Sequence, residues 1–229
     1  MTVPLPTLDH SAAGGACETV FGEDHRVLAK VARLGLGMAV WCRPVDERLS
    51  AWLDGLPEDS LQSDRLLLRP HQARRAVSGV LSEGLRLAEH SVEARLRDSL
   101  ARDVAALTRL FADLAGTRLV DLRLEALRHD ACWRFHYDHV RLRLLCTYCG
   151  PATQWVPPEA RNAALAEQRA YRGPLHELPR FAVALFKGSL APDQVGVVHR
   201  SPPIAGTGRS RLLLCLNEPS SISPLPWEG

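Results

Sequence analysis

Several motifs are missing from this chain of 229 residues, and each absence removes a class of function. It has no glycine-rich phosphate loop, no Gly-x-Ser-x-Gly elbow and no His-Glu-x-x-His motif, so nucleotide hydrolysis, serine hydrolase chemistry and zincin-type proteolysis have no support. The longest nearly apolar run, Leu34 to Cys42, contains two glycines and is under half of the roughly 20 residues that a membrane helix needs. Met1 to Val20 lacks the basic and apolar regions of a secretory signal. We therefore expect a soluble, cytoplasmic protein.

Neither sign of charge is in excess. The net charge is only +2, which predicts no nucleic-acid partner and no membrane surface. Lysine is almost absent: Lys30 and Lys187 are the exceptions among 28 basic residues, so arginine forks for carboxylates are abundant without a bias in total charge. The six cysteines lack the even spacing of a disulfide framework, and without an export signal this favours reduced thiols. The substrate, small molecule or protein, and the oligomeric state are not indicated.

The first half of the chain is predicted to be mostly helical. Residues 1 to 24 have too few apolar groups to offset the entropy of ordering, which predicts a flexible arm. A buried strand is expected over Gly37 to Cys42. Helices are expected over residues 46–56, 72–90 and 92–115, the last with an apolar residue at every third or fourth position until Gly116. We predict a helical part over residues 25–116 with one strand, packed as a scaffold on a sheet.

The period of the apolar residues changes from 3.6 to 2 at about residue 117. Short strands are expected over residues 120–126, 132–148, 181–187, 195–199 and 211–216. Strands without intervening helices indicate an antiparallel sandwich or barrel over residues 117–229. The long polar segment from Pro157 to Leu178 is interpreted either as a functional segment, such as a lid, or as a partly helical one.

Three residues of this half are the predicted metal ligands. On a strand, His136 and Asp138 share the inward face with the apolar residues, and His199 ends another strand just before a Pro-Pro turn. Two imidazoles and one carboxylate leave three positions of a metal open, which is the facial arrangement of non-haem Fe(II) sites. The other charged residues of the first strand have the opposite parity and are expected to point outward: His139, Arg141 and Arg143.

Two arginines follow His199 at an interval suited to a cosubstrate. Arg209 and Arg211 share a face at the start of the final strand, and an arginine fork could bind the far carboxylate of 2-oxoglutarate. Arg211 adjoins an apolar run and is expected inside, whereas Arg209 lies in a glycine-rich loop. Aromatic candidates for the walls of a substrate pocket are Tyr137, Tyr148 and Trp155.

Two other schemes use the same region. A cupin-like zinc-binding or metal-homeostasis protein could use the same three ligands without a cosubstrate, and an Arg211 tied up in an ion pair would favour it. A structural zinc site could use Cys146 and Cys149 with His136 and His139. Positions i and i+3 of a strand face opposite ways, so the second scheme requires local distortions.

The segment from Cys132 to Val140, with later blocks at His199 to Pro203 and Arg211 to Leu214, resembles the signature of a bacterial family known as domain of unknown function 1826. The resemblance extends from about Val27 to Glu218. Its members are thought to be encoded near zinc-handling genes, which leaves the metal open between iron and zinc. Cys149 stands where relatives are expected to carry arginine or another residue.

Separately, the His-x-Asp pair, the distal His and the Arg resemble the superfamily of iron and 2-oxoglutarate dependent oxygenases. That resemblance implies an α+β fold with a double-stranded β-helix (jelly-roll, cupin-like) core in the C-terminal half and N-terminal helices packed on it. It further implies Fe(II), with Zn(II) as the alternative, held by His136, Asp138 and His199, and a dioxygenase that hydroxylates an unknown substrate.

Overall fold

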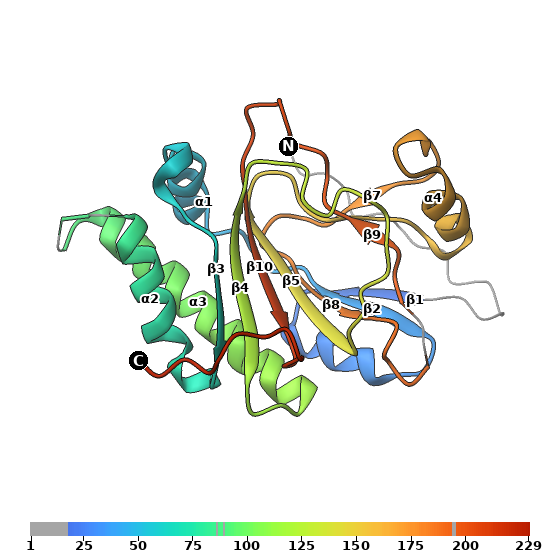
Figure 1. Ribbon diagram of the computed structural model, residues 1–229, viewed down its shortest axis with the longest axis horizontal. Helices are drawn as coiled ribbons and strands as arrows, with labels where there is room; N and C mark the ends of the chain where they lie inside the picture. The colour runs from blue at the N-terminus through green and yellow to red at the C-terminus, as the bar shows by residue number, and fades with distance from the viewer. Residues whose placement is uncertain (1–17, 86, 89, 194–195) are drawn as a thin grey trace.

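A large sheet occupies the centre of the protein in the computed structural model, which describes residues 18–85, 87–88, 90–193 and 196–229 (Figure 1). Its neighbouring strands pair antiparallel, except for the parallel pair of β1 and β2. In spatial order the seven strands are β1 (Glu18–Gly22), β2 (Leu36–Trp41), β8 (Val183–Lys187), β5 (Leu142–Cys149), β10 (Arg211–Asn217), β4 (Val120–Leu127) and β3 (Asp64–Leu68).

Helices cover one face of this sheet (Figure 1). The longest, α3 (Val92–Ala115), begins where the Ser91 hydroxyl accepts a hydrogen bond from the Ala94 N–H and ends at Gly116, whose φ of 67° a residue without Cβ adopts readily. The other α-helices are α1 (Glu47–Asp54), α2 (Ala73–Gly84) and α4 (Arg161–Glu167). Short 3-10 helices are η1 (His25–Ala32), η2 (Glu58–Ser60), η3 (Pro70–Gln72), η4 (Pro158–Ala160) and η5 (Gln168–Ala170).

The apolar stripe of α3 explains how the helical layer is attached. Leu100, Val104, Leu107 and Phe111 are all at most 2% exposed and belong to the core cluster shared with the sheet. Burying each such side chain contributes about 1.5–3 kcal/mol, so the stripe fixes α3 against the strands. The predictions of helices over residues 46–56 and 92–115 are confirmed, and the helix expected over residues 72–90 ends at Gly84.

A second, three-stranded sheet lies against the other face. It consists of β7 (His176–Glu177), β6 (Gln154–Trp155) and β9 (His199–Arg200), with β6 in the middle. An apolar layer joins the two sheets, with Met38, Phe186 and Leu213 from the large sheet against Trp155 and Val197. The fold is therefore a helical layer, a large mostly antiparallel sheet and a small sheet, in that order.

Alternation along β5 decides which residues reach which layer. Leu144 and Cys146 join the core on the helical side, whereas Leu145 faces the small sheet. Cross-strand pairing extends this rule: Leu145 lies opposite Cys215 of β10, which joins the same apolar layer. The face toward the small sheet is therefore lined by the odd-numbered residues at the centre of β5 and by those of β10.

The sheet is not confined to the C-terminal half, contrary to the expected division at residue 117. β2 and β3 both come from residues 25–116, where one strand was predicted, and both pair within the same large sheet. β3 was missed because its partner β4 lies more than 50 residues later, at Leu124 opposite Asp64, and local periodicity carries no trace of such pairing. Within the expected arm, residues 1–17 lie outside the described residues and Glu18–Gly22 form β1 instead.

The strand expected over residues 132–148 is also shorter than predicted. Only Leu142–Cys149 is extended, and Cys132 has a φ of 52°, which is incompatible with a continuing strand. Strands predicted over residues 181–187 and 211–216 are present as β8 and β10. Of the strand predicted over residues 195–199, Val195 lies outside the described residues and His199 begins β9. Within the described part of the chain, no helix combines the length and apolar character needed to cross a membrane.

Candidate metal centre

His136, Asp138 and His199 lie together between the two sheets. One ligand atom from each residue lies within 4.8 Å of the others, so the group could hold a metal ion. The backbones of His136 and His199 form a β-bridge with N–H to O distances of 3.0 and 3.1 Å. This bridge sets the two imidazole rings side by side, with their centroids 4.7 Å apart. Residues more than 60 positions apart are thereby positioned by main-chain hydrogen bonds.

The tautomer of each imidazole follows from its backbone contact. Nδ1 of His136 lies 2.8 Å from the carbonyl oxygen of Arg134, and Nδ1 of His199 lies 2.9 Å from that of Val197. A carbonyl oxygen only accepts, so Nδ1 carries the proton and donates in both rings. In the neutral rings Nε2 therefore presents a lone pair. These Nε2 atoms lie 3.6 Å (His136) and 3.3 Å (His199) from the two carboxylate oxygens of Asp138.

Asp138 supplies a buried negative charge at this point. Its residue is 3% exposed, and its Oδ2 has no hydrogen-bond partner in the described part of the chain. Burial raises the pKa of Asp138, but His199, His136 and Arg143 outweigh burial and lower it to about 2. A buried carboxylate oxygen without a partner is costly in a protein interior, even where the other oxygen is bound. A cation between Oδ2 and the Nε2 lone pairs would remove that cost, so the donor set fits a metal.

The two histidines differ in their surroundings. Burial lowers the pKa of His199, which is 4% exposed. The contact with Asp138 raises the pKa of His136, against the effect of burial. The two shifts run in opposite directions, because Asp138 favours the charged form of His136 whereas burial favours the neutral form of His199.

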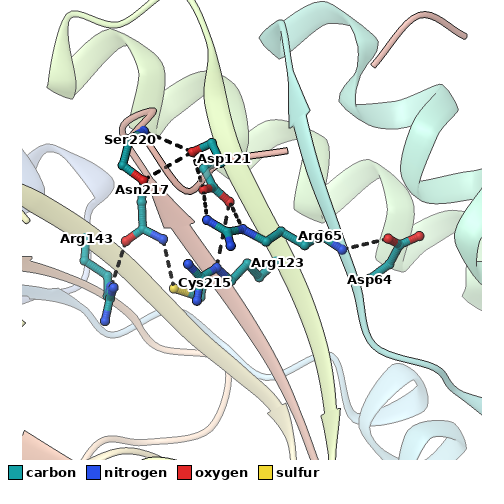
Figure 2. Close-up of polar contacts among 9 residues, drawn as sticks. Asp64, Arg65, Asp121, Arg123, Arg143, Cys215, Asn217 and Ser220 are labelled. Carbon is teal, nitrogen blue, oxygen red and sulfur yellow. Dashed lines mark hydrogen bonds and ion pairs between the residues drawn. The ribbon is translucent and has the colours of Figure 1, made fainter. Parts of the chain in front are cut away.

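Arg143 is a site residue that the sequence argument placed on the wrong face. Its guanidinium donates to Asp138 Oδ1 through Nη1 and to Asn217 Oδ1 through Nε, the latter at 2.7 Å. Figure 2 shows Asn217 between Arg143 and Cys215, whose sulfur accepts from Asn217 Nδ2 at 3.5 Å. The parity argument treated residues 132–148 as one strand. Because the strand begins only at Leu142, the preceding turns bring Asp138 over the odd-numbered face of β5.

Arg211 lies on β10 in the row of odd-numbered residues that faces the small sheet. It is 2% exposed, and none of its three guanidinium nitrogens has a hydrogen-bond partner among the described residues. Burial lowers the pKa of Arg211 to about 10, and the charges of Glu177 and Glu125 oppose this effect. Leaving charged donors unsatisfied costs several kcal/mol, on the order of 3–5 for a buried charge without its partner. This side chain therefore calls for an anionic ligand.

Arg209, the other arginine proposed for a cosubstrate, lies elsewhere. It is exposed, and its backbone N–H donates to the Thr207 hydroxyl at 3.3 Å in the loop before β10. Of the two arginines, the structure therefore buries Arg211 alone.

A cavity of about 90 Å³ opens at the metal ligands. Its walls come from β4, β5, β9, β10 and the turns before β5. The side chains that line it are Arg123, Glu125, Leu127, Ala131, Cys132, His136, Arg143, Leu145, Thr153, His199, Arg200, Ser201, Leu213 and Cys215.

The three aromatic candidates for pocket walls lie away from this cavity. Tyr148 has the parity of the helical side, and its hydroxyl donates to Asp103 at 2.6 Å. Tyr137 packs with the small cluster around Phe135. Trp155 lies in the apolar layer and stacks on His176 at 4.6 Å. The expectation fails for Tyr148 because even-numbered residues of β5 face the helices.

The alternative zinc site at Cys146 and Cys149 is not assembled. Cys146 is buried on the helical side, and Cys149 donates to Asp54 Oδ1 at 3.3 Å. His139 is exposed, with Nδ1 3.0 Å from the Ser189 hydroxyl. Contrary to the expected alternation, both thiols lie on the helical side, because the pairing of β5 with β10 shifts register near Cys149. The four side chains do not converge because His136 lies at the metal centre and His139 is exposed.

The segment proposed as a lid, residues 157–178, contains η4, α4, η5 and β7. It is fastened beside the metal centre by Gln168, whose side chain accepts from the Phe135 N–H at 2.9 Å and donates to the Phe135 carbonyl at 3.1 Å. Both bonds fix the backbone one residue before His136.

A family model described as protein of unknown function (DUF1826) matches residues 22–217. No curated protein matches the chain. Among solved structures, AviO1 from Streptomyces viridochromogenes is similar at 16% identity and a TM-score of 0.40, over 90% of this chain and 99% of that chain. A prolyl-4-hydroxylase from Pseudomonas putida is similar at 15% and 0.40, over 86% and 94%. A bsmA homolog from Methylobium petroleophilum is similar at 15% and 0.42, over 88% and 95%.

These identities and TM-scores are too low to carry an activity over to this chain. The family match is different in kind, because it spans most of the sequence and includes all three metal-ligand candidates. The chain therefore belongs to the family of proteins of unknown function DUF1826.

Proposed function

We propose that the protein is a non-haem Fe(II) and 2-oxoglutarate dependent oxygenase with a double-stranded β-helix core, which hydroxylates an unidentified substrate. The observation that carries this proposal is the buried guanidinium of Arg211, which has no hydrogen-bond partner among the described residues. Arg211 itself lines a separate hollow with Leu53 and Cys149, but it pairs across the sheet with Leu127, which lines the cavity at the metal ligands. Iron in such a site supplies oxygen activation, in which O2, 2-oxoglutarate and a substrate C–H give succinate, CO2 and the alcohol.

Each residue then has a defined task. His136, Asp138 and His199 would hold the metal, as a set of two imidazoles and one carboxylate. The carbonyls of Arg134 and Val197 fix the tautomers that direct Nε2 at the metal. Arg211 receives the far carboxylate of 2-oxoglutarate in two parallel charge-assisted hydrogen bonds.

Burial makes the arginine contact strong. Arg211 is 2% exposed, so solvent would compete little with a charge-assisted hydrogen bond between its guanidinium and a carboxylate. The apolar neighbours Leu213 and Leu145 line the cavity beside the metal ligands and help to exclude water from it.

A zinc-binding protein without oxygenase activity would use the same three ligands, because Zn(II) binds such sites more tightly than Fe(II). It would leave the charge of Arg211 without a function. The unpartnered guanidinium is therefore the feature that favours a carboxylate cosubstrate over metal storage.

The test combines metal analysis with spectroscopy. Protein purified without added metal is analysed for iron and zinc, and apoprotein is then titrated anaerobically with Fe(II) and 2-oxoglutarate. We expect one metal per chain and a weak visible charge-transfer band that requires both additions. His136→Ala and His199→Ala should lose metal and band, whereas Arg211→Met should keep the metal and lose the band.

His139→Ala, at an exposed histidine close to the site in sequence, is the matched control and should behave as wild type. Metal binding with no band and no 2-oxoglutarate affinity would leave the zinc-binding function. Absence of metal binding would remove both.

A further inference from the structure

The wall of the cavity formed by β4 carries one cation and one anion that neighbouring residues leave unpaired. We infer that the substrate of the proposed oxygenase is a small amino-acid-type zwitterion, whose carboxylate is bound by Arg123 and whose ammonium is bound by Glu125. This inference rests on the proposed function and names the substrate class of the same site.

Arg123 reaches the cavity with its charge largely unused. Its side chain is 27% exposed, and its one ion pair within the described residues is a long contact of 3.8 Å from Nε to Asp121 Oδ1. That Nε is buried and has no hydrogen-bond partner. Asp121 is already neutralised by Arg65, which donates to its two oxygens at 2.9 and 2.5 Å (Figure 2). The guanidinium of Arg123 is therefore available to a ligand.

Glu125 is the anion on the same wall. It lies two residues after Arg123 on β4, so the two side chains point to the same face, about 6.5–7 Å apart along the strand. Glu125 lines the cavity and, within the described residues, has no hydrogen bond and no ion pair, including none with Arg123. Glu125 faces the charges of Arg211 and Arg143 without contacting either, so both Arg123 and Glu125 are free to contact a ligand.

The remaining charged groups of the cavity have partners in contact. Arg143 is bound to Asp138, and Arg200 donates to the neutral amide oxygen of Gln154 at 2.9 Å and lies over the Phe135 ring, 4.3 Å from its centroid. Arg211 does not line this cavity and is assigned to the cosubstrate. Among the charged groups that line the cavity without a hydrogen bond, one cation and one anion are left, and a ligand of single charge would enter the cavity beside a group of its own sign. A zwitterion satisfies both groups at once.

The size of the site agrees with a small ligand. A cavity of about 90 Å³ is well below the roughly 300–1,000 Å³ of pockets for drug-sized molecules. Attachment at two points would also fix the orientation of the ligand, so that the same C–H bond would always face the metal ligands.

The test measures binding, separately from turnover. Full-length protein loaded with Zn(II) and 2-oxoglutarate is titrated calorimetrically with each of the common L-amino acids. The tightest binder is then compared with its decarboxylated amine and its deaminated acid. We expect each single-charge analogue to bind at least tenfold more weakly than the amino acid.

Variants assign the two charges. In Arg123→Gln the amine should bind as well as the amino acid, and in Glu125→Gln the deaminated acid should do so. Arg102→Gln and Glu93→Gln, both at exposed positions of α3, are matched controls and should keep the wild-type preference.

Four outcomes would overturn the inference. If metal and 2-oxoglutarate bind but no amino acid does, the substrate class is wrong and the proposed function stands. Equal binding of the acid and the amino acid would indicate a simple anion site, and equal binding of the amine a simple cation site. If the protein binds no metal, the proposed function itself fails and the inference fails with it.

Discussion

Arg143 donates a hydrogen bond to Asp138, five residues earlier in the chain, and so fastens a metal-ligand candidate in a loop to the start of strand β5. The contact is buried, since the Asp138 side chain is 2% exposed and that of Arg143 is 19% exposed. Asn217 holds the same guanidinium from β10. The orientation of the carboxylate is thus set by two strands of the large sheet.

Replacing Arg143 should weaken metal binding without removing a ligand. Groups that orient metal ligands typically contribute 10–100-fold in affinity, so Arg143→Leu should lower Zn(II) affinity by about that factor in a chelator competition assay. Arg143→Lys keeps the charge but not the planar guanidinium, so its Zn(II) affinity should lie between those of wild type and Arg143→Leu. Arg141→Leu removes an arginine that binds Glu218 instead and serves as the control. Wild-type affinity in Arg143→Leu would show that the contact does not position Asp138.

Replacing Arg211 with an apolar residue should have opposite effects on stability and on cosubstrate binding. Its guanidinium is buried and unpaired in the described residues, so an apolar side chain of similar length should be tolerated better in the empty site. Arg211→Met should raise the free energy of unfolding by about 1–4 kcal/mol, as replacements of buried charges often do. It should also abolish binding of 2-oxoglutarate to the Zn(II)-loaded protein.

Thermal unfolding and calorimetric titration measure the two effects. Arg209→Met, at an exposed arginine two residues away, should change the free energies of unfolding and of 2-oxoglutarate binding by no more than about 0.5 kcal/mol. Destabilisation by Arg211→Met with cosubstrate affinity intact would mean that Arg211 has a structural partner and no role in binding.

The metal ligands could be predicted from sequence, but the argument that selected them was only half correct. His136, Asp138 and His199 do converge. The pairing that brings them together is a β-bridge between His136 and His199, not a continuous strand through Asp138. Chain order and residue type identified the three donors, whereas the assumed parity gave the wrong face for Arg143.

Residues whose positions depend on long-range pairing could not be found in this way. The strand β3 has its partner β4 far along the chain, and a short apolar run such as Leu66–Leu68 reads equally well as a helix start or a loop. The strand that carries Arg123 and Glu125 was predicted over residues 120–126, but only the placement of β4 beside β10 turns one of its faces into a cavity wall. Tertiary pairing, which local periodicity does not record, decided these cases.

The ion pair of Asp121 and Arg65 should make stability depend on pH. Burial raises the pKa of Asp121, but hydrogen bonds from Arg65 and Ser223 outweigh it and hold the pKa below its usual value. The folded state therefore binds this proton less readily than the unfolded state. The pair contributes stability above the unfolded pKa of about 3.9, and the contribution is lost as pH falls through the folded pKa.

Asp121→Asn should consequently destabilise the protein most at neutral pH. Arg65 is 30% exposed, so we expect a modest loss of about 1–3 kcal/mol at pH 7 in urea unfolding. The difference from wild type should shrink as the pH is lowered below about 4. Asp98→Asn, at a carboxylate that is 48% exposed on α3, is the control and should show a small difference at every pH. A loss for Asp121→Asn that stays constant down to pH 3 would contradict the linkage.

Gly150, at the end of β5, should be required for the position of Arg211. Its φ is 74°, and a Cβ there would collide with the backbone carbonyl oxygen of Ser210, the residue before Arg211. Gly150→Ala must therefore displace the start of β10 as well as accept a strained backbone. We expect the free energy of unfolding to fall by more than the roughly 1 kcal/mol that a positive φ alone costs, and 2-oxoglutarate to bind more weakly.

Gly206→Ala separates the effect of backbone strain from the effect of the collision, because Gly206 has a φ of 73° and open space around the new methyl group. Gly206→Ala should be destabilised by the backbone strain and should bind 2-oxoglutarate as wild type does. Equal loss of 2-oxoglutarate binding in the two variants would show that the contact at Ser210 does not position Arg211.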